Sequence, residues 1–257
     1  YCSVDLVYPA NPALNQKKRT ETVTQAQLAF QKGEKLCADN CRFVSRLNLV
    51  PVCGAKRALY RKCHFESTDD ALNGNAVYVG CDFDFYGNRP IYQATGTGAV
   101  FIDCIFRSKI KTMGTEAEQY LTKEGGQVAL IDCRYETEGN VPVRVGWTKY
   151  PLPSLKCYQY GVVQNGKPVT LGGDDSEETV QLQGKKALEA YVFEYEEKRY
   201  INIENLLGGS KGWNPPGEPS ISKKAGKLRI PTFMQLHTDR EKIAFGEETI
   251  HVTANVY

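Results

Sequence analysis

The 257-residue sequence lacks the features that mark several common protein classes. It has three histidines and no Cys-x-x-Cys pair, so it does not carry the usual ligand pattern of a structural zinc site. No apolar run is long enough to cross a bilayer as a helix. The formal net charge of +2 gives no indication of nucleic-acid binding. We therefore expect no membrane span, no nucleic-acid partner, no metal ion and no cofactor.

Length and composition indicate a globular protein with one large domain, or one domain and a fragment of another. The chain is 41% hydrophobic and 24% charged. It begins at Tyr1, without an initiator methionine or a signal peptide, and we interpret it as a mature or trimmed fragment.

Six of the nine cysteines recur in one four-residue pattern, in which an aromatic residue usually stands two places after the cysteine. The spacings between these cysteines are 22, 18, 23, 29 and 24 residues, and repeats of this length are typical of solenoids. Residues two apart on a strand share one face, so cysteine and aromatic side chains point the same way. We therefore predict an all-β, right-handed parallel β-helix with an internal file of cysteines. The six units are Asn40–Phe43, Lys62–Phe65, Gly80–Phe83, Asp103–Phe106, Asp132–Tyr135 and, more weakly, Lys156–Gln159.

The alternative interpretation of the cysteines is a secreted disulfide framework. The count is odd, and six cysteines occupy one repeated inward position, where a thiol packs as a small hydrophobic group. Stacked neighbours also have the wrong geometry for regular disulfide bonds. These points favour free thiols in the file, whereas Cys2, Cys37 and Cys53 lie outside it and could have other roles.

The pattern changes toward the C-terminus. Between residues 22 and 170 alternation predicts strands and no amphipathic helix, whereas 185–197 fits a short helix or a strand equally well. Residues 201–226 end the repeat, and the alternation after residue 230 predicts two further strands. We expect a β-helix over 1–222 and the opening of an immunoglobulin-like β-sandwich, or a C-terminal β extension, over 223–257.

Several segments, in order, resemble the pectin methylesterase family of carbohydrate esterases. Coils ending at Cys41 and Cys63 match in order, as do Tyr120–Thr122 and Val143–Tyr150, and the tail Tyr200–Gly209 is similar to versions from gut Bacteroidetes. The resemblance covers a little over half of the chain and implies a right-handed parallel β-helix that removes methyl esters from galacturonate. It also implies an acidic, pectin-like plant polysaccharide as partner, a monomer, and a secreted, periplasmic or cell-surface location.

Members of this family use two aspartates on adjacent coils, one as nucleophile and one as the acid that protonates methanol. Seven residues past successive cysteines stand Asn48, Asp70, Asn88 and Lys111. The resemblance puts Asp70 in the place of the acid and Asn88 in the place of the nucleophile. A shifted register, which we favour less, makes Asp70 the nucleophile and Asn48 the acid. One aspartate is missing in both registers, and the family arginine falls one place early, at Arg144.

Other residues are candidates for substrate contacts. Trp147 and Tyr86 could stack on sugar rings, or could pack in the core. Arg144, Arg89 and Lys111 could receive a uronate carboxylate, or could be ordinary surface charges. Asp69 could replace the missing aspartate, although alternation along a strand would turn it to the opposite side.

Three functions follow from these residues. The first is an esterase that acts on a pectin-like acidic polysaccharide with an altered catalytic pair. The second is a non-catalytic β-helix that binds acidic glycans along the same groove. The third, less favoured, is a pectate-lyase-like enzyme with calcium held by carboxylates such as those of Asp69, Asp70, Asp82 and Asp84.

Overall fold

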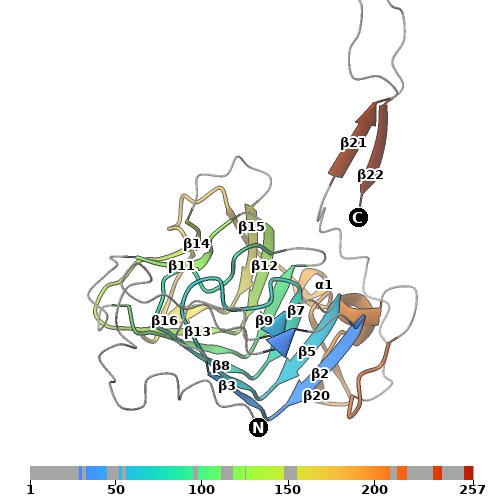
Figure 1. Cartoon of the computed structure of the whole chain (residues 1–257), viewed down its shortest axis with the longest axis horizontal. Coiled ribbons are helices and arrows are strands. Elements are labelled where there is room, and N and C mark those ends of the chain that lie inside the picture. The colour runs from blue at the N-terminus through green and yellow to red at the C-terminus, as the bar shows by residue number, and fades with distance from the viewer. Residues whose placement is uncertain are drawn as a thin grey trace, which may run out of the picture.

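The regular structure of the computed structural model is almost entirely β-strand, and its two largest sheets have seven strands each (Figure 1). The first sheet is parallel throughout, and the second is parallel except at its last pair, β16–β17. The structure describes residues 29–30, 33–44, 52–53, 56–94, 98–110, 118–124, 126–147, 155–208, 213–218, 234–238 and 252–256.

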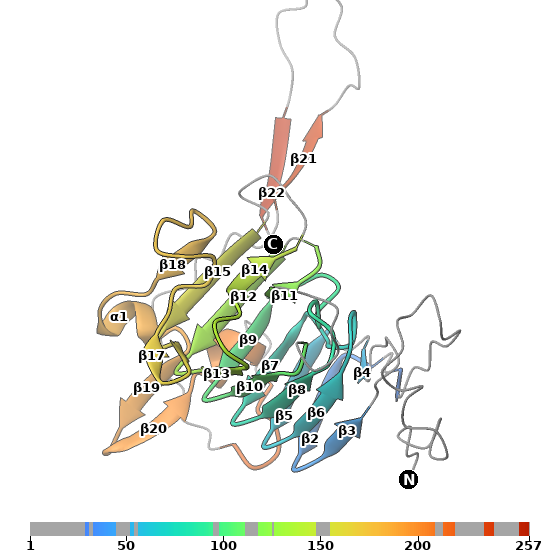
Figure 2. The same ribbon diagram turned by 90° about the vertical axis from the view of Figure 1, so that its left-hand side faces the viewer.

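Each strand of the first sheet except the last, β18, is followed by a strand of the second, and we call each such pair of strands a coil (Figure 2). In spatial order the first sheet contains β2 (Lys35–Asp39), β5 (Arg57–Arg61), β7 (Ala76–Val79), β9 (Ala99–Ile102), β12 (Gly126–Ile131), β15 (Leu155–Tyr160) and β18 (Thr179–Gln181). The second contains β3 (Arg42–Val44), β6 (His64–Ser67), β8 (Asp82–Phe85), β10 (Ile105–Ser108), β13 (Arg134–Thr137), β16 (Val163–Gln164) and β17 (Lys167–Pro168). This alternation is compatible with a parallel β-helix.

A third, shorter set of parallel pairings follows the second sheet along the chain. Leu72 pairs with Ile91, and Ile91 pairs with Thr122. Thr122 ends β11 (Gln119–Thr122), which pairs with β14 (Val143–Gly146). We call these four segments the short ladder. A separate parallel pair joins β1 (Ala29–Phe30) to β4 (Val52–Cys53).

The bend between the two sheets has the same backbone conformation in every described coil. One residue at each bend has a positive φ, between 50° and 64°, which is the left-handed region. A single residue in this conformation turns the chain sharply between two strands. The bend residues are Asn40, Lys62, Gly80, Asp103, Asp132 and Gly161.

Five of the six cysteines take the same place in successive coils, and the predicted internal file is confirmed for four of them, since Cys41 is exposed. Cys41, Cys63, Cys81, Cys104 and Cys133 each follow a bend residue, and the last four are buried. The sixth position was wrong. Cys157 lies within β15 opposite Val128, while the residue that follows the sixth bend is Val162. The seven cysteines whose side chains are described are free thiols, as the sequence favoured.

Aromatic rings stack beside this file from coil to coil. On the second sheet Phe83 lies between Phe65 and Phe106, with ring centroids 5.0 and 5.2 Å away. A parallel stack on the first sheet runs through Tyr78 and Phe101, 4.7 Å apart. The two stacks meet edge to face, which is a favourable geometry for aromatic pairs. Together they fill the space between the sheets.

A second apolar cluster lies on the other face of the first sheet, where the C-terminal part of the chain covers it. The cover comprises α1 (Lys185–Leu188), β19 (Val192–Tyr195), β20 (Lys198–Ile201) and the π-helix η3 (Glu204–Gly208). The segment 185–197, which the sequence left open between helix and strand, therefore contains both. Buried Tyr191, Ile203 and Leu206 pack against Val77 and Val100 of the sheet.

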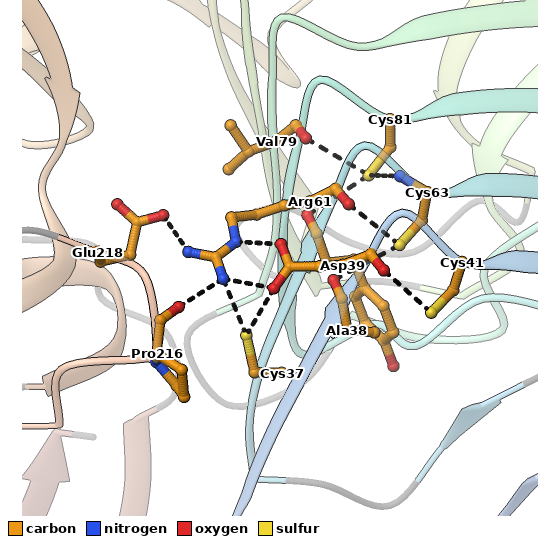
Figure 3. Close-up of polar contacts among 11 residues, drawn as sticks. Cys37, Ala38, Asp39, Cys41, Arg61, Cys63, Val79, Cys81, Pro216 and Glu218 are labelled. Atoms are coloured by element: carbon orange, nitrogen blue, oxygen red, sulfur yellow. Dashed lines mark hydrogen bonds and ion pairs between the residues drawn. The ribbon is translucent and has the colours of Figure 1, made fainter.

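Residues Trp213–Glu218, which we call the strap, are held to the first sheet by two arginines of β5. The Arg61 guanidinium contacts the Asp39 carboxylate, Glu218 Oε1 at 2.5 Å, the Pro216 carbonyl and Cys37 Sγ (Figure 3). Arg57 lies over the Trp213 ring, with Cζ 5.9 Å from the centroid. The strap, which follows η3 in the chain, is therefore anchored to β5, one of the first strands of the first sheet.

The C-terminal prediction is confirmed in part. β21 (Met234–Thr238) pairs antiparallel with β22 (Val252–Val256), as the alternation predicted. Two paired strands support a hairpin, and the immunoglobulin-like sandwich expected for 223–257 has no support. No helix among the described residues is both long and apolar enough to cross a membrane.

Candidate functional site

The exposed side of the short ladder gathers most of the residues that the sequence singled out. Asp69 and Asp70 lie at the turn before its first segment, Arg89 lies on the second, and Arg144 and Trp147 lie on or just after the last. We call this surface the ladder face. It is built by segments far apart in sequence, because parallel pairing sets successive coils side by side.

Counting from the cysteines, which put Asp70 beside Asn88, was wrong by one residue at the short ladder, where Leu72 pairs with Ile91 and not with Pro90. The Asp70 backbone N–H donates to the Arg89 carbonyl at 2.9 Å. The reason is the length of the coils: Leu72 lies nine residues after Cys63, whereas its partner Ile91 lies ten residues after Cys81. Counting a fixed number of residues from each cysteine therefore predicts the wrong partner at the short ladder.

Asn88 lies beneath the ladder face and does not form part of its surface. Its side chain is buried, with 1% of the residue exposed, and its amide donates to the Glu118 carbonyl at 3.1 Å. Buried Gln119 donates to the Asn88 carbonyl at 3.2 Å. Asn88 thus belongs to a buried polar layer that supports the ladder, and it does not occupy the surface position that we had predicted for a catalytic residue.

Asp69, Arg89 and Trp147 form one connected group on the ladder face. Asp69 accepts the Arg89 backbone N–H at 2.9 Å and its guanidinium at 3.0 Å. Arg89 Cζ lies 4.2 Å from the centroid of the Trp147 ring, which is 44% exposed. Gly87 leaves room for this turn, because a Cβ there would come within 2.5 Å of the Asp69 carboxylate. The arginine is therefore fixed between a carboxylate and an exposed indole.

Asp70, Lys123 and Tyr92 form a second group of the same kind. Lys123 Nζ lies 3.3 Å from Asp70 Oδ2 and 5.0 Å from the centroid of the Tyr92 ring. Tyr92 is 45% exposed. The other carboxylate oxygen of Asp70 is buried and has no hydrogen-bond partner among the described residues. The sequence reasoning missed Lys123 and Tyr92, and only the position of Lys123 next to the quoted segment Tyr120–Thr122 could have drawn attention to it.

A third group surrounds Arg144, the exposed arginine of β14. Arg144 Nε lies 2.8 Å from Glu118 Oε1, and the Tyr120 hydroxyl donates to the other Glu118 oxygen. The hydrogen bond from Tyr120, and then that from Arg144, lower the pKa of Glu118 from its ordinary value. The sequence reasoning missed Glu118, which no repeated pattern marks.

The remaining predicted residues are Tyr86, Lys111 and the alternative Asn48. Tyr86 is half-buried at the end of β8, where its backbone N–H donates to the Ser67 carbonyl at 2.8 Å. Lys111 falls outside the residues that the structure describes, as does Asn48.

The proposed cation ligands Asp82 and Asp84 are engaged elsewhere. Both contact the guanidinium of Arg107, at 2.6 and 3.3 Å. Burial opposes ionisation of Asp82, but hydrogen bonds from Arg107 and His64 hold its pKa below the ordinary value. Within the described ranges, no group of three or more His, Cys, Asp or Glu side chains is arranged to hold a metal ion.

The ladder face therefore combines three cations, three carboxylates and two exposed rings. Chemically it offers donors for anionic groups and flat apolar surfaces for rings. No protein-family model, curated protein or solved structure matches this chain.

Proposed function

We propose that the chain is a right-handed parallel β-helix that binds an acidic polysaccharide on its ladder face and catalyses no reaction on it. In this proposal the two large sheets and the short ladder are three sides of one coil. The observation that carries the functional part is the repeated pairing of an exposed ring with a cation, Trp147 with Arg89 and Tyr92 with Lys123.

Each ring–cation pair matches the two halves of a uronate residue. The C–H face of a sugar ring is apolar and packs well on an aromatic ring. The uronate carboxylate requires a cationic hydrogen-bond donor, and a guanidinium can receive it in a bidentate geometry. Arg89 and Lys123 already face carboxylates, so a uronate would compete with Asp69 and Asp70 for them. Arg144, the most exposed of the three cations, is the first that an incoming chain would meet.

The chemistry of the Asn88 position favours binding over ester cleavage. An esterase of the aspartate type needs a nucleophilic carboxylate and a carboxylic acid that faces the same ester. Asn88 supplies neither group, and its side chain is buried beneath the ladder. Asp70 would have to act with Asp69, whose two oxygens are both bonded to Arg89.

Ester hydrolysis remains the second candidate function because of the environment of one Asp70 oxygen. Oδ1 of Asp70 is buried and has no hydrogen-bond partner in the described part of the chain. Such a group carries a cost of roughly 1–3 kcal/mol, and a catalytic role is one of the explanations for such a cost. A demethylating esterase built around Asp70 would use this carboxylate as its reactive group.

Two measurements separate these functions. We expect the chain to be retarded in gels that contain polygalacturonate, and Trp147→Ala to weaken binding by about tenfold, because an aromatic contact contributes roughly 1 kcal/mol or more. Tyr195→Ala, which removes an exposed ring outside the ladder face, is the matched control. Binding should also fall with rising salt, since part of it is ionic.

The second measurement is methanol release from methylated pectin. We expect none above the uncatalysed background. Release that Asp70→Ala abolishes would refute the non-catalytic proposal and establish the esterase. Equal retardation of the wild-type protein, Trp147→Ala and Tyr195→Ala would remove the ladder face as the binding surface. Because acidic plant polysaccharides lie outside cells, we expect the protein to act in a secreted, periplasmic or cell-surface setting.

A further inference from the structure

A hollow lies near the bend between the two large sheets, where α1 and the β19–β20 hairpin approach the end of β15. Its volume is about 330 Å³, at the lower end of the range of small-molecule sites. The short ladder follows the second sheet, whereas this hollow follows the first, so the two lie at different corners of a coil. Figure 2 shows α1, β19 and β20 on the same side as β18.

Three apolar side chains line the hollow, and Tyr160 adds an exposed ring. Leu188, Val192 and Phe193 line the interior, and the last two are buried. Tyr160, the last residue of β15, lines the hollow and is 40% exposed. A partly exposed tyrosine offers a flat apolar face together with a hydroxyl that can donate or accept a hydrogen bond.

Charged residues of both signs line the hollow. Lys185 and Arg199 supply two cations, and Glu189 and Glu194 supply two carboxylates. Arg199 and Glu194 are directly opposite across the β19–β20 pair. Arg199 is also bonded to Asp103 and Asp132, so carboxylates outnumber cations around the hollow and an anionic ligand would be repelled. Hydroxyl groups, in contrast, can donate to the carboxylates and accept from the cations.

The Arg199 side chain is held in place by the coils themselves. Its guanidinium donates to Asp103 at 3.1 Å and also to Asp132, the bend residues of two successive coils. Neither aspartate lines the hollow itself. Arg199 is therefore held in position before any ligand arrives, and a preformed site loses less entropy on binding.

We propose that this hollow is a second carbohydrate site, which binds a neutral sugar unit stacked on Tyr160. Apolar side chains, one exposed ring, and both donors and acceptors suit a molecule that has an apolar C–H face and many hydroxyls. This site does not depend on acidic-glycan binding at the ladder face, because no residue is shared between them.

The test is saturation-transfer NMR on the full chain, with methyl glycosides of glucose, galactose and xylose as probes and galacturonate as the charged comparison. We expect at least one neutral glycoside to bind with a millimolar Kd and galacturonate not to compete for it. Tyr160→Ala should weaken that binding about tenfold, the scale of one aromatic contact. Tyr195→Ala, which removes a tyrosine outside the lining, should leave the Kd unchanged.

Glu194→Gln gives an independent check, because it keeps the side-chain shape but removes a charged acceptor. It should weaken glycoside binding several-fold while the circular dichroism spectrum stays unchanged. The proposal is overturned if none of the neutral glycosides binds, or if Tyr160→Ala and Glu194→Gln both bind as the wild type does. It is also overturned if Trp147→Ala removes the binding and Tyr160→Ala does not, since the sugar would then occupy the ladder face.

Discussion

The stacked rings of the second sheet allow a stability prediction for Phe83→Ala. Phe83 is fully buried, stacks on Phe65 and Phe106, and meets Tyr78 and Phe101 edge to face at 5.5 and 5.6 Å. Removing a buried phenylalanine side chain costs about 3–5 kcal/mol, from lost burial and from the cavity left behind. We expect the upper half of this range, because neighbouring coils hold the flanking rings apart and the cavity cannot close.

The assay is equilibrium unfolding in urea, followed by far-ultraviolet circular dichroism. A loss of this size is a large share of the 5–15 kcal/mol that typically stabilises a domain, so the midpoint should fall steeply while the slope stays similar. Phe83→Leu should lose less than Phe83→Ala, because it keeps most of the apolar volume. Tyr195→Ala, at a residue that is 48% exposed, should stay within about 0.5 kcal/mol of the wild type. A loss below about 1 kcal/mol in Phe83→Ala would falsify the close-packed aromatic stack.

Two further predictions concern charged groups. Arg61→Gln should release the strap Trp213–Glu218, because Arg61 donates to Glu218 and to the Pro216 carbonyl, and each charge-assisted hydrogen bond contributes roughly 1.5–3 kcal/mol. Limited proteolysis should then cut the strap faster than in the wild-type protein, and an unchanged cleavage rate would contradict this. The Tyr120 hydroxyl and Arg144 lower the pKa of Glu118, so its stabilising contribution is complete above its ordinary value of 4.5 and is lost as the pH falls through the lowered value. Glu118→Gln should flatten the acid side of a plot of thermal midpoint against pH, and an unchanged plot would show that the pairing is not stabilising.

The repeat could be predicted from the sequence because it depends on residues that are close together in the chain. A cysteine and an aromatic residue two places apart must share a strand face, and each coil repeats this unit. The residue before each cysteine was part of the pattern, and it proved to be the left-handed bend at Asn40, Lys62, Gly80, Asp103 and Asp132. Cys157 lacks the aromatic residue two places on, and it lies within β15 of the first sheet, opposite Val128, and not after a bend.

The candidate site was only partly readable. Aromatic and basic residues near the ladder, such as Trp147, Arg89 and Arg144, could be named because their chemistry suits a glycan. Their partners could not, because Lys123 is 53 residues from Asp70 and no periodicity links the two.

The sequence by itself determined that the chain stacks strands with cysteines and aromatic rings turned inward, since alternation and spacing are properties of neighbouring residues. Only the tertiary structure decided which residues meet on the ladder face. Coil lengths vary by a residue or more, and one added residue moves Asn88 into the interior and brings Arg89 against Asp69 and Asp70. Register between coils depends on hydrogen bonds across distant segments, and these exist only in the folded chain.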